Sequence, residues 1–93
     1  DIIKNVCDFY GFKPTQIKSS KRSASLVKIR HILMYLLKKE LSLTFVEIGN
    51  ILGGRDHSTV MHGVEKVEKL LSDKGFYEEM LGVSAFLKSK RVD

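Results

Sequence analysis

The sequence predicts an all-α protein, a compact helical domain of about five to six helices that contains a helix-turn-helix. Apolar residues recur at helical spacing through most of the 93 residues. No stretch alternates apolar and polar residues as a half-buried strand would. Proline occurs once, at Pro14. The length and the 43% hydrophobic content favour a single domain over residues 1–93.

The first part of the chain is predicted to form two helices joined by a loop. Residues 1–10 form a short helix that Gly11 ends, with Ile2, Ile3, Val6 and Phe9 facing inward. Pro14 cannot continue a helix from the residues before it, so residues 12–22 are interpreted as a loop or a short turn. A long helix over residues 24–41 follows. Its apolar stripe comprises Leu26, Ile29, Leu33, Leu36 and Leu37.

The next helix carries a clear start signal. Thr44 and Glu47 fit a capping box, and Leu43 and Ile48 stand where a hydrophobic staple would close. The helix is expected to stop at residues 53–54, where two glycines can adopt left-handed backbone conformations.

Asp56 is a good N-cap for the helix that follows. Its buried stripe would be Val60, Val64, Val67 and Leu71, and residues 73–75 would end it. A last helix over residues 76–87 would place Tyr77, Met80, Leu81 and Leu87 in the core.

Two short capped helices around a tight turn at residues 53–55 make a helix-turn-helix. Gly49, in the first of the two, would let the second approach closely.

The charge distribution favours a polyanionic partner. The net charge is +5, and no acidic residue lies between Asp8 and Glu40. That stretch carries eight cations: Lys13, Lys18, Lys21, Arg22, Lys28, Arg30, Lys38 and Lys39. A solvated surface would also account for such a run.

The first turn of the helix after residue 55 suits base recognition. An α-helix fits the major groove, where its first turn meets the bases. Asp56 can accept a hydrogen bond from a cytosine amino group, and His57 and Thr59 can contact thymine. Arg55, just before this turn, can hold a phosphate. Helix capping with a solvated surface is the alternative interpretation of the same residues.

Residues 53–62, Gly-Gly-Arg-Asp-His-Ser-Thr-Val-Met-His, resemble the signature of the C-terminal domain of DnaA, the bacterial chromosomal replication initiator family. Residues 30–36 and 47–49 resemble its preceding motifs, and residues 20–23 resemble its basic loop. The resemblance covers essentially the whole chain. It implies sequence-specific binding of double-stranded DNA at short boxes, the DnaA boxes, in the replication origin.

The resemblance also implies a role for individual residues. Those that match base-reading positions are Arg22, in the adjacent minor groove, and Asp56, His57, Ser58 and Thr59. Those that match backbone or supporting positions are Arg30, His31, Lys38, Arg55 and His62. We also assign four residues to the DNA backbone: Lys21, Lys28, Phe45 and Val46. Ala24 and Lys28 replace frequent arginines, Val46 a frequent proline and Ser58 a common threonine, which would soften sequence preference.

For the whole protein, the resemblance implies an ATP-dependent AAA+ initiator whose nucleotide domain lies upstream. Such a protein would be cytoplasmic, would associate with the nucleoid and would oligomerise on DNA, whereas this domain alone would be monomeric. Its further partners would include regulatory proteins and acidic phospholipid. The fragment itself is expected to be no enzyme and to hold no cofactor or metal.

Other functions fit the sequence less well. Residues 49–56 come near a phosphate-binding loop, but they lack its Lys-Ser/Thr pair and follow a helix instead of a strand. His57 and His62 are five residues apart and do not share a helix face as the paired histidines of zinc proteases do. Charged residues interrupt every candidate membrane span, and a lone cysteine, Cys7, permits no internal disulfide. A generic helix-turn-helix transcription regulator is the nearest alternative.

Overall fold

Six α-helices make up the regular structure of residues 1–91, the part of the chain that the computed structural model describes. The described residues contain no strand, so the predicted all-α class is confirmed. The helices are α1 (Ile2–Tyr10), α2 (Pro14–Lys18), α3 (Ala24–Leu41), α4 (Phe45–Ile51), α5 (His57–Leu70) and α6 (Lys74–Ser89).

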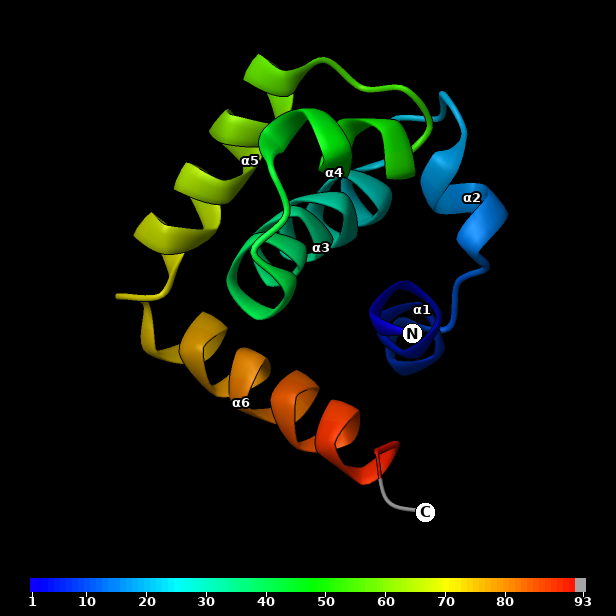
Figure 1. Cartoon of the computed structure of the whole chain (residues 1–93). Coiled ribbons are helices and arrows are strands. Elements are labelled where there is room, and N and C mark those ends of the chain that lie inside the picture. Colours follow the sequence, from blue (N-terminus) through cyan, green and yellow to red (C-terminus); the bar gives the residue numbers. More distant parts are fainter. Residues whose placement is uncertain (92–93) are drawn as a thin grey trace.

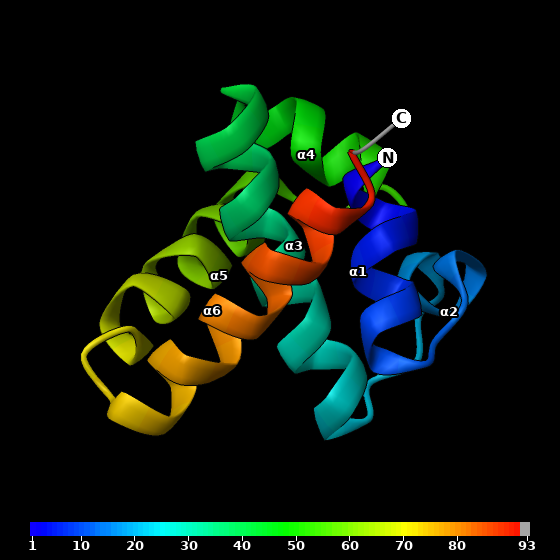
Figure 2. The ribbon, with the colours of Figure 1, turned by 90° about the horizontal axis from the view of Figure 1, so that it is seen from below.

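Helix α3 lies at the centre and the other helices surround it (Figures 1 and 2). It packs against α1, α2, α4 and α5, whereas α6 packs on α1. The five apolar residues of the predicted α3 stripe are all buried, because their spacing places them on the faces that α1 and α5 cover. No helix within residues 1–91 combines the length and apolar character that crossing a bilayer requires.

Local capping signals set the boundaries of α4 and α5. The Thr44 hydroxyl accepts a hydrogen bond from the Glu47 amide at 3.1 Å, and the Glu47 carboxylate accepts one from the Thr44 amide at 2.8 Å. The Asp56 carboxylate accepts one from the Ser58 amide at 2.9 Å. The predicted capping box and the predicted N-cap are both confirmed.

Three expectations from the sequence are wrong in part. Residues 14–18 form the short helix α2, because Pro14 suits a first helical turn, where its missing N–H costs nothing. Helix α6 begins at Lys74, because Asp73 caps it instead of ending α5. The buried face of α6 also differs from the expected one. Tyr77 and Leu81 are exposed, and the buried positions are Phe76, Met80, Val83 and Leu87.

The first helix also differs from its predicted core face. Phe9 is exposed and Cys7 is buried, so the inward face of α1 is turned toward Val6 and Cys7. Cys7 packs among apolar residues, as a small buried hydrophobic side chain does.

The turn between α4 and α5 depends on the missing side chain of Gly49. The amides of Gly54 and Arg55 both donate to the Gly49 carbonyl at 2.9 Å. A Cβ at Gly49 would lie 2.0 Å from the Arg55 carbonyl oxygen. The backbone could not stay there with any larger residue. The predicted close approach at Gly49 is therefore confirmed.

We expect Gly49→Ala to destabilise the domain by about 1–3 kcal/mol or more, because backbone would have to move to admit the methyl group. Gly82 in α6 is the matched control, since its added Cβ would meet only Phe9 at an ordinary 3.7 Å. Gly82→Ala should stabilise by up to about 1 kcal/mol through helix propensity. Urea unfolding of both variants measures the two effects. Equal effects of the two substitutions would contradict the close-approach role of Gly49.

Candidate nucleic-acid interface

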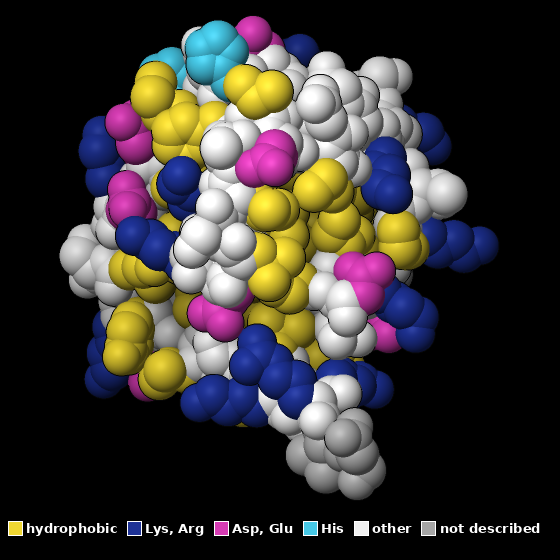
Figure 3. All heavy atoms as spheres, viewed as in Figure 1, with side chains coloured by type: hydrophobic (Ala, Val, Ile, Leu, Met, Phe, Trp, Pro, Cys, Tyr) yellow, Lys and Arg dark blue, Asp and Glu magenta, His cyan; other side chains and the backbone are white. Residues whose placement is uncertain are grey.

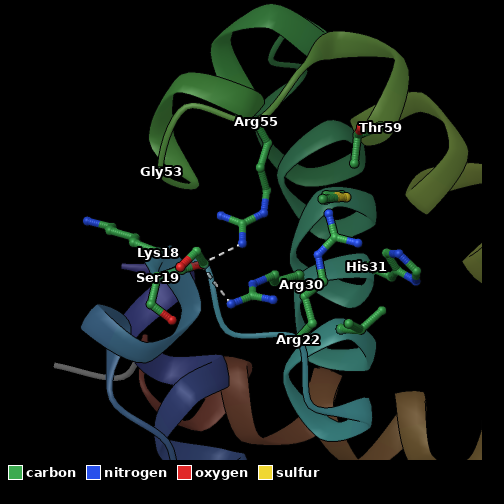
Figure 4. Close-up of a pocket in the computed structure, with 11 residues that line it drawn as sticks. Lys18, Ser19, Arg22, Arg30, His31, Gly53, Arg55 and Thr59 are labelled. Carbon is green, nitrogen blue, oxygen red and sulfur yellow. Dashed lines mark hydrogen bonds between the residues drawn. The ribbon is translucent and has the colours of Figure 1, made fainter.

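A basic cleft of about 640 Å³ opens where the segment after α2, the first half of α3 and the α4–α5 turn meet (Figure 4). Within residues 1–91, no acidic side chain lines it. The face shown in Figure 3 differs, since side chains of both charges are interspersed there with apolar ones. The cleft is lined by Lys18, Ser19, Ser20, Arg22, Val27, Arg30, His31, Met34, Gly53, Arg55 and Thr59.

Three guanidinium groups share this cleft. Arg22 is exposed, Arg55 is half-buried and Arg30 is buried. Burial, followed by the charges of Arg55 and Arg22, lowers the pKa of Arg30, and burial and Arg22 lower the pKa of Arg55. Both groups stay cationic at neutral pH because arginine starts from so high a value. Like charges held together in this way favour an anion between them.

Arg30 does not lie on the surface, as a phosphate contact would. It is 4% exposed, and four of its five N–H groups donate to backbone carbonyls. The acceptors are Gln16 at 3.2 Å, Ile17 at 2.8 Å, Ser19 at 2.9 Å and Lys21 at 2.5 Å. This geometry fits the supporting role that was predicted for Arg30. It does not fit a direct contact of Arg30 with the DNA backbone.

Arg55 is bonded less completely. One amino group donates to the Leu52 carbonyl, and the other donates to the Ser19 carbonyl at 2.7 Å. Three of its N–H groups have no protein acceptor in residues 1–91, so the guanidinium keeps donors for a ligand in the cleft.

The first turn of α5 adjoins the cleft. Asp56, His57 and Thr59 are exposed, and Thr59 lines the cleft itself (Figure 4). Ser58 is half-buried. The amide of Ser58 holds the pKa of the Asp56 carboxyl below its usual range, so this carboxylate is ionised at neutral pH. The four predicted base-reading positions on α5 therefore follow one another along a single exposed turn.

The remaining residues that were predicted to contact the DNA backbone lie at several places on the domain. Lys21 is exposed in the segment before α3. The amino group of Lys38 lies 4.8 Å above the centre of the Phe45 ring, next to the exposed Val46 at the start of α4. His62 is exposed on α5, with its Nδ1 3.6 Å from a Glu65 oxygen.

Lys28 is directed away from the cleft. Its amino group pairs with the Glu79 carboxylate of α6 at 2.9 Å, and Tyr10 donates to the same carboxylate. Lys28 thus joins α3 to α1 and α6, which does not favour its predicted contact with the DNA backbone.

The side chain of His31, a residue of α3, packs against α5. Its ring packs so closely on Gly63 that a Cβ there would lie 2.9 Å from the imidazole Cδ2. Burial, and then the charge of Lys66, lowers the pKa of His31. This histidine forms one wall of the cleft.

Sequence reasoning did not single out three parts of the cleft: the Lys18 side chain, the Ser19 carbonyl and Gly53. Lys18 belongs to the acid-free stretch, which was the one available signal. A Cβ at Gly53 would lie 2.3 Å from the Lys18 carbonyl oxygen, and its φ of 89° also favours glycine. The α4–α5 turn therefore packs directly on the backbone that follows α2.

Two capped helices, the glycine turn between them, and an exposed polar turn beside a basic cleft define a helix-turn-helix domain. Comparison with known proteins places it further. Residues 1–67 match the family described as bacterial dnaA protein helix-turn-helix. The chain belongs to this family.

Individual relatives agree with that assignment. The chain is 44% identical over 87 residues to the chromosomal replication initiator protein DnaA of Thermomicrobium roseum, which covers 92% of this chain and 19% of that protein. It is 41% identical over 83 residues to the protein of the same name from Chloroflexus aurantiacus strain J-10-fl, covering 88% and 17%. For the Ureaplasma parvum protein of that name the identity is 40% over 79 residues, covering 85% and 17%. The chain thus spans less than a fifth of each of these relatives.

We expect the stability of the domain to fall as the pH drops below 6.5. The lowered pKa means that the folded state favours neutral His31, so the unfolded state binds more protons in this range. The stabilisation is fully present above 6.5, the ordinary pKa of histidine, and is lost toward the lower folded pKa. Urea unfolding between about pH 7.5 and 5.5 measures this slope. His31→Gln should flatten it and the exposed control His62→Gln should not; the same slope in all three proteins would argue against the role of His31.

Proposed function

We propose that this domain binds double-stranded DNA sequence-specifically at boxes of the bacterial replication origin. Helix α5 would lie in the major groove with its first turn against the bases, and Arg22 would enter the adjacent minor groove. The observation that carries the proposal is the exposed turn at residues 56–59 beside a cleft lined by cations and no acids. The names of the relatives, each a chromosomal replication initiator, support a role in the initiation of replication.

The chemistry of the site matches both parts of a DNA duplex. The cleft would take a phosphate, for which Arg55 keeps a planar array of free donors. The uncharged side chains of α5 carry short donors, acceptors and methyl groups of the size that base edges accept. Arg22, exposed at the cleft, has the charge that a narrow A·T minor groove attracts.

Asp56 is the residue that best separates base reading from simple basicity. Its ionised carboxylate repels phosphates, so a nonspecific binder would do better without it. The repulsion is offset if the carboxylate accepts from a cytosine amino group, a contact that discriminates by about 1–3 kcal/mol. Under this proposal the ATP-dependent steps of initiation belong to other parts of the whole protein.

Asp56→Asn tests this assignment, because asparagine caps a helix about as well as aspartate. We expect unchanged melting, equal or slightly tighter binding to scrambled duplex, and about a tenfold loss of preference for an origin box. Fluorescence anisotropy with labelled box and scrambled duplexes measures the preference. Full discrimination by the variant would leave Asp56 as a cap alone. Preference for non-origin operators over origin boxes in the wild type would favour a transcription regulator.

Arg22→Ala tests the minor-groove contact. We expect it to weaken binding most where the segment beside the box is A·T-rich, because a narrow groove concentrates negative potential. The measurement is the ratio of Kd values for duplexes with G·C and A·T flanks. Lys21→Ala is the control, since a neighbouring exposed cation that contacts phosphate should affect both flanks alike. Equal losses in the Arg22 variant on both flanks would reduce this residue to a phosphate contact.

A further inference from the structure

The Ser19 carbonyl oxygen accepts hydrogen bonds from two arginines of different elements (Figure 4). Arg30 of α3 donates to it at 2.9 Å, and Arg55 of the α4–α5 turn donates at 2.7 Å. Ser19 ends α2, and its carbonyl has no helical partner. Two guanidinium groups therefore satisfy one backbone acceptor that both reach from outside the segment.

The Arg30 guanidinium holds both ends of the short segment that leads to Arg22, and Arg55 adds a second donor at Ser19. Arg30 also donates to the Lys21 carbonyl, so it fixes the chain at residues 19 and 21, immediately before the predicted minor-groove arginine. The flanking backbone offers little alternative restraint, since the Lys21 amide donates only to the Ser19 hydroxyl, at 3.3 Å. The direction in which Arg22 leaves the fold thus depends on Arg30.

Arg55 connects this segment to the recognition helix. It directly precedes Asp56, the N-cap of α5, and also donates to the Leu52 carbonyl at the end of α4. Gly53 brings the turn within contact of the Lys18 backbone. A displacement of the α4–α5 turn would therefore displace Ser19, and a displacement of Ser19 would displace the turn.

We propose that Arg30 and Arg55 are positioning residues that couple the minor-groove arm to the recognition helix through the shared Ser19 carbonyl. Placement of Arg22 and seating of α5 then occur together, so that a duplex correct in one groove strengthens contact in the other. This inference rests on the proposed function for its DNA readout. It adds that Arg55, in the turn of the helix-turn-helix, controls part of the preference of Arg22 for A·T-rich over G·C-rich flanks.

Arg55→Lys is the decisive variant, because it keeps the charge but loses the planar fork that reaches Leu52 and Ser19 together. The probes are duplexes carrying the sequence that the wild-type domain selects from a random pool, with A·T or G·C flanks. We expect the flank ratio of Kd values to fall about threefold or more, within the usual range for coupled neighbours. Added to Arg22→Ala, the same change should produce no further loss of this ratio. Arg91→Lys, the same substitution at an arginine that pairs with Glu40 and does not line the cleft, should leave the ratio intact.

Arg55→Lys that weakens binding equally on both flanks, or that adds fully to Arg22→Ala, would overturn the coupling. A measurement without DNA separates this failure from failure of the proposed function. In the free protein, NMR order parameters of the amides of residues 20–23 should fall in Arg55→Lys and stay unchanged in Arg91→Lys. Unchanged order in Arg55→Lys would overturn the proposal even if the domain bound no origin DNA.

Discussion

Burial of the Arg30 guanidinium, with its four hydrogen bonds to backbone carbonyls, is the interaction on which the basic cleft of this domain depends. The chain from the end of α2 to the start of α3 contains no regular structure, so its carbonyls need partners from elsewhere. One side chain of the central helix donates to two of these carbonyls, at Ser19 and Lys21, and also to the Gln16 and Ile17 carbonyls of α2. An uncompensated buried charge would be costly, but here every bond is made to a backbone oxygen. The cost of burying the arginine and the need of the loop for donors therefore offset each other.

This arrangement explains which features the sequence could predict. The caps at Thr44 and Asp56 join residues two or three positions apart, so their patterns are visible in the sequence itself. Apart from the contact of Arg55 with Leu52, the bonds of Arg30 and Arg55 span 9 to 36 positions, and they end on backbone oxygens, which any residue type provides. No residue pattern marks them. The exposed turn of α5 was predictable for the same reason as its cap, whereas the cleft required the fold.

The misplaced start of α6 has a different cause. Asp73 is a good breaker for one helix and a good cap for the next, and sequence alone does not decide between the two. The buried row of α6 is a separate matter, and it consists of Phe76, Met80, Val83 and Leu87. These follow one another at steps of three and four residues, the spacing of a single helix face. Tyr77 and Leu81 each follow a member of that row by one position, which is about 100° further round the helix, so they point away from the row and are exposed.

The electrostatics of the cleft show why the fold tolerates so many cations there. Burial, and then the charges of Arg55 and Arg22, lowers the pKa of Arg30, and burial and Arg22 lower the pKa of Arg55. The neighbouring positive charges repel one another in the folded domain, and within residues 1–91 no acidic side chain of the cleft lining relieves this repulsion. Burial of the core around α3 supplies the stability that offsets the repulsion. A phosphate placed between the guanidinium groups would remove it, so an anionic ligand would convert this unfavourable interaction into affinity.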